Sequence, residues 1–347
     1  MHYRLFGRGT GLRVSELALG TGMFGLRWGY GAAPGDARHI FDAYVEAGGN
    51  FIDTADSYQF GEAEEMLAGF VVERRHDLVL ATKYTMGSGP GGTVLSIGNT
   101  RKSMIQSVEG SLKRLSTDRL DLLWVHMPDG VTSSEEIMRG LDDLVRSGKV
   151  LYIGLSDFPA WRVAHAATVA ELCGWAPLAA VQIEYSLLER TSDRETLPMA
   201  QAFGLGVAGW SPLGGGVLSG KYRRGETGRA TGFGRLIQVE NSAQRTGILD
   251  TVEAVAQETG ANAAQVSLAW MIGRGIMPIL GPRTPAQLID TLGAVGLRLT
   301  DEQAGRLTDA SVVQLGFPHD LLADPAQVTR LGGGIPDQVE RPLAPVA

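Results

Sequence analysis

Short apolar segments alternate with amphipathic helical segments along most of this 347-residue chain, and no other feature constrains the fold as strongly. The apolar segments have the length and composition of buried strands. We predict strands near Ala18–Gly20, Phe51–Asp53, Val79–Thr82, Leu122–His126, Tyr152–Ser156, Ala180–Glu184, Gly206–Trp210 and Met277–Leu280. Helical patterns fill the intervals, for example over Asp36–Ala47, Thr100–Leu115, Ser134–Arg146 and Thr251–Thr259, with Asn99 or Thr100 and Ser134 as the expected N-caps. Parallel strands joined by helices form an open doubly wound sheet or a closed barrel, and eight units over this length favour a (β/α)8 TIM barrel.

The chain ends and two long loops depart from this rhythm. Residues 3–6, a glycine-rich break over 7–11 and residues 12–15 predict an N-terminal β-hairpin that caps the barrel. We expect one domain over 1–347, with a core over about 16–310 and an irregular C-terminal extension, 311–347, that packs over the barrel and has a disordered end. The loops Tyr84–Asn99 and Ser211–Asn241 follow strands, at the barrel face where such folds bind substrates.

The composition restricts the partners. With a formal net charge of -7 and no basic run, the chain lacks the footprint of a nucleic-acid or anionic-membrane binder, so we expect a small-molecule partner. Cys173 is the only cysteine, which excludes an intrachain disulfide and a thiolate metal cluster and fits a reducing cytoplasm. We expect no metal. The sequence shows no signal peptide and no apolar run near the roughly 20 residues of a membrane span, and it leaves homo-oligomer formation open.

One glycine motif suggests a different fold. Residues Gly20 to Gly25 match G-x-G-x-x-G after a predicted strand, which is typical of dinucleotide-binding sheets. In those sheets a helix begins within the motif, so that its N-terminus faces the pyrophosphate. Here residues 28–35, which include three glycines and a proline, intervene before helical periodicity begins. We therefore expect these glycines to let the first barrel loop approach a ligand.

Four polar residues coincide with the ends of consecutive predicted strands. Asp53, Lys83 and His126 each end a strand, and Tyr58 follows Asp53 in the next loop. Each has an ordinary alternative role: a cap, a packing aromatic, a solvated base or a core imidazole. Together they favour a site, because strand ends converge in a barrel and a buried lysine needs a carboxylate partner.

These four residue types suit the reduction of a carbonyl group. Hydride addition leaves an alkoxide that needs a proton donor, and the Tyr58 phenol could supply the proton. Its ordinary pKa of about 10 is high for this task, and an adjacent ammonium at Lys83 is expected to lower it. Asp53 would hold Lys83, and His126 could donate a hydrogen bond to the carbonyl oxygen.

The spaced motifs of the chain resemble the aldo-keto reductase family, close to the branch of the potassium-channel β subunits. The resemblance runs from about residue 3 to 310 and rests on Asn50–Tyr58, Ala81–Lys83, Asp121–His126, Gly154–Ser156, Gln182–Tyr185 and Trp210–Lys221. It implies a catalytic tetrad of Asp53, Tyr58, Lys83 and His126. It also implies a cytoplasmic oxidoreductase that uses NADPH to reduce an aldehyde or ketone.

The resemblance further implies a cofactor site along the barrel mouth. Ser156 and Gln182 would hold the nicotinamide carboxamide, Trp210 would lie against the ring, and Arg283 would grip a 2'-phosphate. The implied cofactor-binding residues are Gly20, Thr21, Ser156, Gln182, Trp210, Ser211, Pro212, Leu213, Gly215, Leu218, Lys221, Gly281, Arg283, Gln287 and Asp290. Asp157 replaces the asparagine or arginine often found after the serine, and Asp290-Thr291 replaces a common Glu-Asn pair, which leaves the adenine contacts open.

Two other functions compete with this interpretation. A regulatory subunit could bind NADPH as a redox sensor with little turnover, although channel-associated relatives typically have asparagine at the position of His126. A Schiff-base aldolase could use Lys83, but this leaves Trp210–Lys221 unexplained. For the substrate we expect a carbonyl compound larger than a simple sugar, with Trp28, Tyr30 and Phe60 as an aromatic wall or as packing residues.

Overall fold

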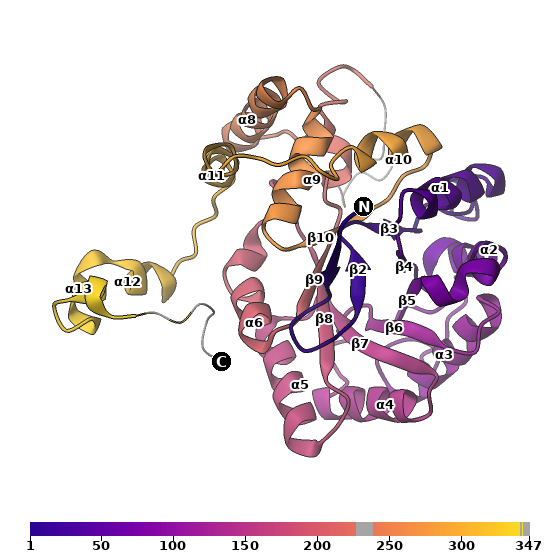
Figure 1. Cartoon of the computed structure of the whole chain (residues 1–347). Helices are drawn as coiled ribbons and strands as arrows, with labels where there is room; N and C mark the ends of the chain where they lie inside the picture. The colour runs from indigo at the N-terminus through magenta and orange to yellow at the C-terminus, as the bar shows by residue number, and fades with distance from the viewer. Residues whose placement is uncertain (227–238, 341, 343–347) are drawn as a thin grey trace.

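Eight parallel strands close into a barrel, which confirms the predicted TIM barrel (Figure 1). The computed structural model describes residues 1–226, 239–340 and 342. Each strand pairs with the next along the chain, and the last pairs with the first. The barrel strands are β3 (Ala18–Gly20), β4 (Phe51–Asp53), β5 (Val79–Tyr84), β6 (Leu120–Val125), β7 (Val150–Ser156), β8 (Leu178–Glu184), β9 (Gly206–Trp210) and β10 (Met277–Leu280).

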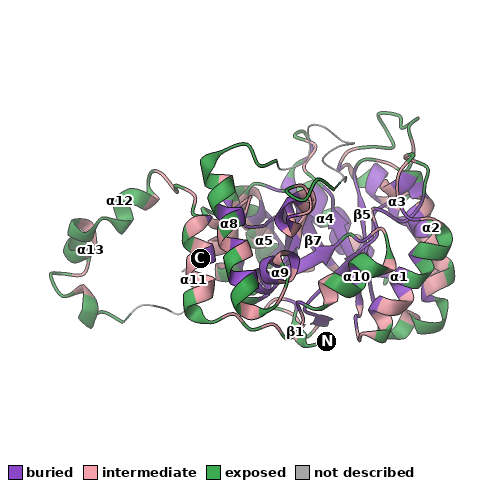
Figure 2. Cartoon of the chain, turned by 90° about the horizontal axis from the view of Figure 1, so that it is seen from above, coloured by how far each residue is buried: buried purple, intermediate pink, exposed green. Residues whose placement is uncertain are grey.

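Helices surround the barrel and bury one face against the strands (Figures 1 and 2). They are α1 (Pro34–Glu46), α2 (Glu62–Val71), α3 (Arg101–Arg114), α4 (Ser134–Arg146), α5 (Ala160–Cys173), α6 (Thr196–Phe203), α8 (Ala243–Thr259), α9 (Ala263–Gly273), α10 (Pro285–Leu292) and α11 (Asp301–Ala310). Short 3-10 turns lie at η1 (Tyr58–Gly61), η2 (Val72–Asp77), η3 (Thr191–Asp193), η4 (Gly214–Ser219) and η5 (Pro336–Gln338).

In helix α4, the local sequence determines both the face that is buried and the residue at which the helix begins. Ile137, Leu141 and Leu144 recur at helical spacing and are buried, so one stripe packs on the barrel. The hydroxyl of Ser133 accepts a hydrogen bond from the backbone N–H of Glu136 and caps the helix. The expected cap at Ser134 is therefore wrong by one residue, whereas Thr100 caps α3 as predicted. The last predicted helix was too short, because α8 begins at residue 243.

The N-terminal hairpin closes the bottom of the barrel. Strands β1 (Tyr3–Leu5) and β2 (Arg13–Ser15) pair antiparallel, as predicted. The hairpin loop inserts Phe6, whose ring lies 5.4 Å from Phe51 and 6.3 Å from Trp124, centroid to centroid. A Cβ at Gly154 would lie 2.4 Å from the Trp124 ring, so only glycine leaves room for this side chain. These contacts fill the lower interior and leave the opposite end for a site.

The C-terminal extension differs from the expected irregular chain packed over the barrel. It contains two short helices, α12 (His319–Ala323) and α13 (Pro325–Leu331), and it runs outward from the barrel side (Figures 1 and 2). Among its described residues, the bonds to the barrel side lie near its start, where Gln244 donates to the carbonyl of Val312 at 3.0 Å and Arg194 donates to the carbonyl of Phe317 at 2.8 Å. His319 of α12 also pairs with Glu195 at 2.9 Å. The final residues that we expected to be disordered, and residues 227–238 of the second long loop, lie outside the described part. Among the residues that the structure describes, no helix has the length and apolarity to span a membrane.

Candidate active site

The structure brings the four predicted catalytic side chains together at the carboxyl ends of β4, β5 and β6. Asp53 ends β4, Lys83 lies near the end of β5, and His126 directly follows β6. The ammonium of Lys83 forms an ion pair with Asp53 and donates to the Tyr58 hydroxyl at 3.1 Å. The rings of Tyr58 and His126 meet edge to face, 5.9 Å apart. Asp53 and Lys83 are each 1% exposed, so water barely screens their interaction.

Burial and the neighbouring charges set the protonation states of Lys83, Tyr58 and His126. Burial acts to lower the pKa of Lys83, but Asp53 and Tyr58 outweigh it, so its pKa lies above the ordinary value and the amine stays charged. Burial raises the pKa of Tyr58, and the Lys83 ammonium opposes this effect without overcoming it. The expected effect of Lys83 on the Tyr58 pKa is therefore present, but burial outweighs it and the pKa lies above its ordinary value. Burial, followed by the charge of Lys83, lowers the pKa of His126 to about 3, so its imidazole is neutral.

Gln182 connects the tetrad to the opposite wall of the barrel. Its side-chain amide donates to Oδ1 of Asp53 at 3.0 Å, while Lys83 binds the other carboxylate oxygen. Ser156 lies beside Gln182 in the β7–β8 register, so both predicted carboxamide contacts share one level of the barrel mouth. The bond between Gln182 and Asp53 could not be predicted from the sequence, because the two residues lie 129 positions apart.

Trp210 ends β9 and lies half-buried at the barrel mouth. Its indole N–H donates to Oδ1 of Asp157 at 3.0 Å, and the Asp157 carboxylate also accepts from Ser156 at 3.4 Å. In the sequence, Asp157 stands out only as a departure from the family pattern. The aspartate in place of the usual asparagine or arginine was the available sign of a role for this position, since an acidic residue near the predicted Trp210 platform alters the local charge.

The residues after Trp210 form a tight glycine turn. Gly215 and Gly216 have φ of +69° and +95°, a conformation that favours glycine. A Cβ at Gly216 would lie 2.6 Å from the ammonium nitrogen of Lys221, so the bare glycine lets this charge approach the turn. Ser211 is also in the left-handed region, with φ of +53°. The predicted contacts Pro212 and Leu218 are buried, and Leu213 is half-buried.

The predicted adenosine segment follows β10. The guanidinium of Arg283 lies over the Tyr30 ring, 4.6 Å from its centroid. The side chain of Gln287 accepts from the backbone N–H of Arg283 at 2.9 Å, and Asp290 accepts from Asn262 at 2.7 Å. Gln287 and Asp290 therefore have internal partners, whereas Gly281 is exposed with open space where a side chain would lie.

Gly20 and Thr21, at the carboxyl end of β3, lie next to Asp53 and hold the end of β4 in place. A Cβ at Gly20 would lie 2.7 Å from Ile279 of β10, so this glycine permits close packing of the two strands. Thr21 is buried and donates from both its backbone and its hydroxyl to the carbonyl of Asp53. Both predicted contact residues thus have a structural role in holding the end of β4.

The predicted aromatic wall is divided between two places. Trp28 packs edge-on against Tyr58 and Phe60, at 6.2 Å and 6.3 Å between ring centroids. Tyr30 instead lies under Arg283. Gln59, which no sequence pattern singled out, is a buried residue with φ of +50°. Its side chain accepts from the Trp28 backbone N–H at 2.8 Å and donates to the Tyr30 carbonyl at 2.9 Å. Gln59 therefore ties the first loop to the loop that carries Tyr58.

Comparisons with known proteins agree with this geometry. A profile described as the Aldo/keto reductase family matches residues 16–312. The chain is 36% identical to norsolorinic acid reductase of Aspergillus flavus over 92% of this chain and 84% of that protein. It is 34% identical to aryl-alcohol dehydrogenase [NADP(+)] of Phanerodontia chrysosporium (93% and 89%) and 38% identical to an uncharacterized oxidoreductase of Bacillus subtilis (89% and 95%). The extent of the family match and of these alignments shows that the chain belongs to the aldo/keto reductase family.

Proposed function

We propose that this chain reduces an aromatic aldehyde or ketone to the alcohol with NADPH, with Tyr58 as the proton donor. One observation carries the proposal: a buried ammonium, Lys83, lies between Asp53 and the Tyr58 hydroxyl, next to the neutral imidazole of His126. This arrangement suits a reaction that develops negative charge on an oxygen.

The residues at the barrel mouth fit a nicotinamide cofactor. Trp210 offers a partly exposed aromatic face, the Lys221 ammonium lies against a turn of glycines, and Arg283 carries a guanidinium that suits a phosphate. NADPH is favoured over NADH by Arg283 and by the NADP(+) in the name of one relative. When bound, the cofactor would supply a hydride.

The protein side chains would manage the charge that hydride addition creates. His126, neutral at physiological pH, would donate its N–H to the carbonyl oxygen and orient it. Tyr58 would pass its phenolic proton to the same oxygen. The phenolate left behind would be stabilised by Lys83, whose positive charge Asp53 maintains in a buried place.

The same electrostatics disfavour the Schiff-base alternative. A lysine nucleophile must lose its proton, and such lysines have lowered pKa values. The pKa of Lys83 is raised, because Asp53 and Tyr58 hold the ammonium form.

Two features support an aromatic substrate. Trp28 packs against Tyr58 on one side and Phe60 on the other, and Phe60 remains 37% exposed, so an aromatic surface extends from the proton donor. The names of two relatives refer to aryl alcohols and to norsolorinic acid. We therefore propose aryl aldehydes and aryl ketones as the substrate class.

The test follows NADPH consumption at 340 nm with a panel of aromatic and aliphatic carbonyls. Wild type should prefer aromatic members, and Tyr58→Phe should lose at least about 100-fold in kcat, within the range for removal of a general acid. Tyr3→Phe is the matched control, because it removes a phenol hydroxyl on the N-terminal hairpin, which donates to the carbonyl of Gly48 after α1. Near-normal turnover in Tyr58→Phe would refute the assigned role. Tight NADPH binding without turnover of any carbonyl would favour the cofactor-sensing alternative.

A further inference from the structure

Asp157 places a fixed carboxylate at the edge of the Trp210 indole. Its Oδ1 accepts the indole N–H at 3.0 Å and its Oδ2 accepts from Ser156 at 3.4 Å. Its φ is +56°, a left-handed conformation that glycine, asparagine and aspartate adopt at low cost. Backbone and side chain therefore both hold the carboxylate beside the ring.

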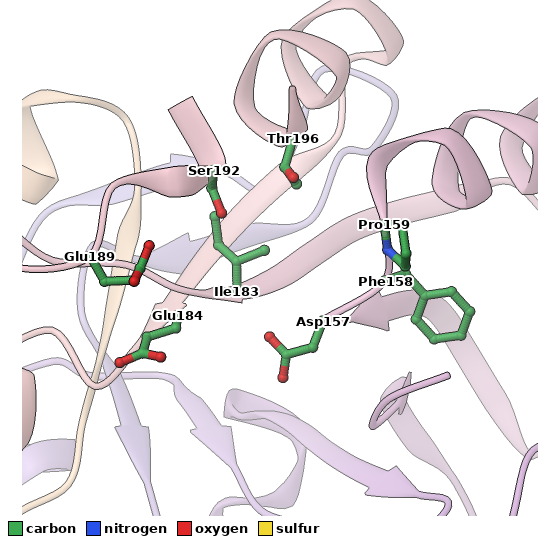
Figure 3. A pocket seen from close by; sticks show the side chains of 8 residues that line it. All are labelled: Asp157, Phe158, Pro159, Ile183, Glu184, Glu189, Ser192 and Thr196. Carbon is green, nitrogen blue, oxygen red and sulfur yellow. The ribbon is translucent and has the colours of Figure 1, made fainter. Parts of the chain in front are cut away.

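A shallow pocket of about 330 Å³ opens next to this carboxylate. Figure 3 shows Asp157, Glu184 and Glu189 around it, and none of the eight described residues that line it is basic. Partial burial raises the pKa of Asp157, while the hydrogen bonds from Trp210 and Ser156 oppose this effect. Asp157 is itself exposed at this pocket, so its carboxylate is in contact with solvent.

We propose that the Asp157 carboxylate biases the cofactor site towards the oxidised form, NADP⁺. The inference rests on the proposed function, in which the nicotinamide lies against Trp210. The oxidised nicotinamide ring carries a positive charge and the reduced ring is neutral, while the rest of the cofactor is the same in both. A negative charge fixed at the platform edge therefore favours one redox form and leaves the phosphate contacts unchanged.

The affinity ratio of the two cofactor forms isolates this effect. Isothermal titration calorimetry at pH 8 would give Kd for NADP⁺ and for NADPH with wild type, Asp157→Asn and Glu189→Gln. Asparagine keeps the hydrogen-bond acceptor and tolerates the left-handed backbone, so the variant removes the charge alone. We expect the ratio Kd(NADP⁺)/Kd(NADPH) to rise by about three- to tenfold in Asp157→Asn, the size of a screened charge interaction.

Glu189→Gln is the matched control. It removes a carboxylate from the same pocket, but Glu189 bonds to the backbone N–H of Thr191 rather than to Trp210. Its ratio should change by less than about twofold. An unchanged ratio in Asp157→Asn, or an equal shift in both variants, would overturn the inference while the proposed function stands. Failure of the wild type to bind either cofactor form would overturn both.

Discussion

Replacing Lys83 by methionine should separate the stability of the buried ion pair from its role in the reaction. The Lys83 side chain is 0% exposed and its partner Asp53 is 2% exposed. The ammonium also donates to the Thr54 carbonyl at 2.9 Å and to Tyr58 at 3.1 Å. In Lys83→Met, the carboxylate of Asp53 would keep, among the described residues, only the hydrogen bond from Gln182. The variant therefore leaves a buried carboxylate without a counter-charge.

The expected loss is large because the remaining charge has no access to water. Removing one partner of a buried pair costs about 3 to 5 kcal/mol of unfolding free energy. Replacing both partners with apolar side chains of similar size is often neutral, because no charge is then buried. The double variant Lys83→Met/Asp53→Leu should therefore recover most of the loss, to within about 2 kcal/mol of wild type.

Urea denaturation followed by circular dichroism would measure all three proteins, and carbonyl reduction would be assayed in parallel. We expect the double variant to be stable yet inactive, because the charge beside Tyr58 is gone. A loss below about 1 kcal/mol in Lys83→Met, or a double variant no more stable than the single one, would refute the reasoning.

Three further perturbations follow from particular contacts. Phe6→Ala should cost about 3 to 5 kcal/mol in urea denaturation, because the 2% exposed ring fills the barrel bottom against Phe51. Burial raises the pKa of Asp56 to about 7, so the folded protein retains a proton that the unfolded chain loses near pH 4. Wild-type stability should fall as the pH rises from about 4 to about 7, and Asp56→Asn should gain about 2 to 3 kcal/mol relative to wild type between pH 5 and pH 8. Arg283→Ala should weaken NADPH binding by about 10- to 100-fold in calorimetry and leave NADH binding within about threefold.

For each of these three variants, one result would contradict the prediction. An unchanged midpoint in Phe6→Ala would mean that the hairpin does not complete the core. Parallel stability curves for wild type and Asp56→Asn across the pH range would show that this carboxyl is ionised in the folded protein. Equal losses of NADPH and NADH affinity in Arg283→Ala would assign the guanidinium to the Tyr30 contact rather than to a 2'-phosphate.

The sequence predicted the barrel and the place of the tetrad because both depend on local patterns. Apolar runs such as Phe51–Asp53 and Val79–Tyr84 are strands that bury both faces, and strand ends in a barrel necessarily converge. The polar residues at those strand ends could therefore be predicted to lie close together without knowing how the residues of neighbouring strands pair. The hairpin followed from its glycine-rich break.

What the sequence could not supply depends on long-range geometry or on small energy differences. The bonds from Gln182 to Asp53 and from Trp210 to Asp157 join residues far apart in the chain. The net pKa of Tyr58 reflects the balance between burial and the Lys83 charge, which no residue pattern reveals. The helices of the extension, five and seven residues long, are too short for periodicity to identify.

The most direct test of the account is whether the hydride of the cofactor enters the product. Wild-type protein would reduce an aryl aldehyde with NADPH deuterated at C4 in one or the other stereochemical position, and mass spectrometry would measure deuterium in the alcohol. We predict transfer from one of the two labelled forms only, because a fixed platform at Trp210 would leave one face of the nicotinamide ring open to the substrate. Alcohol without deuterium from either form, or equal transfer from both, would contradict it.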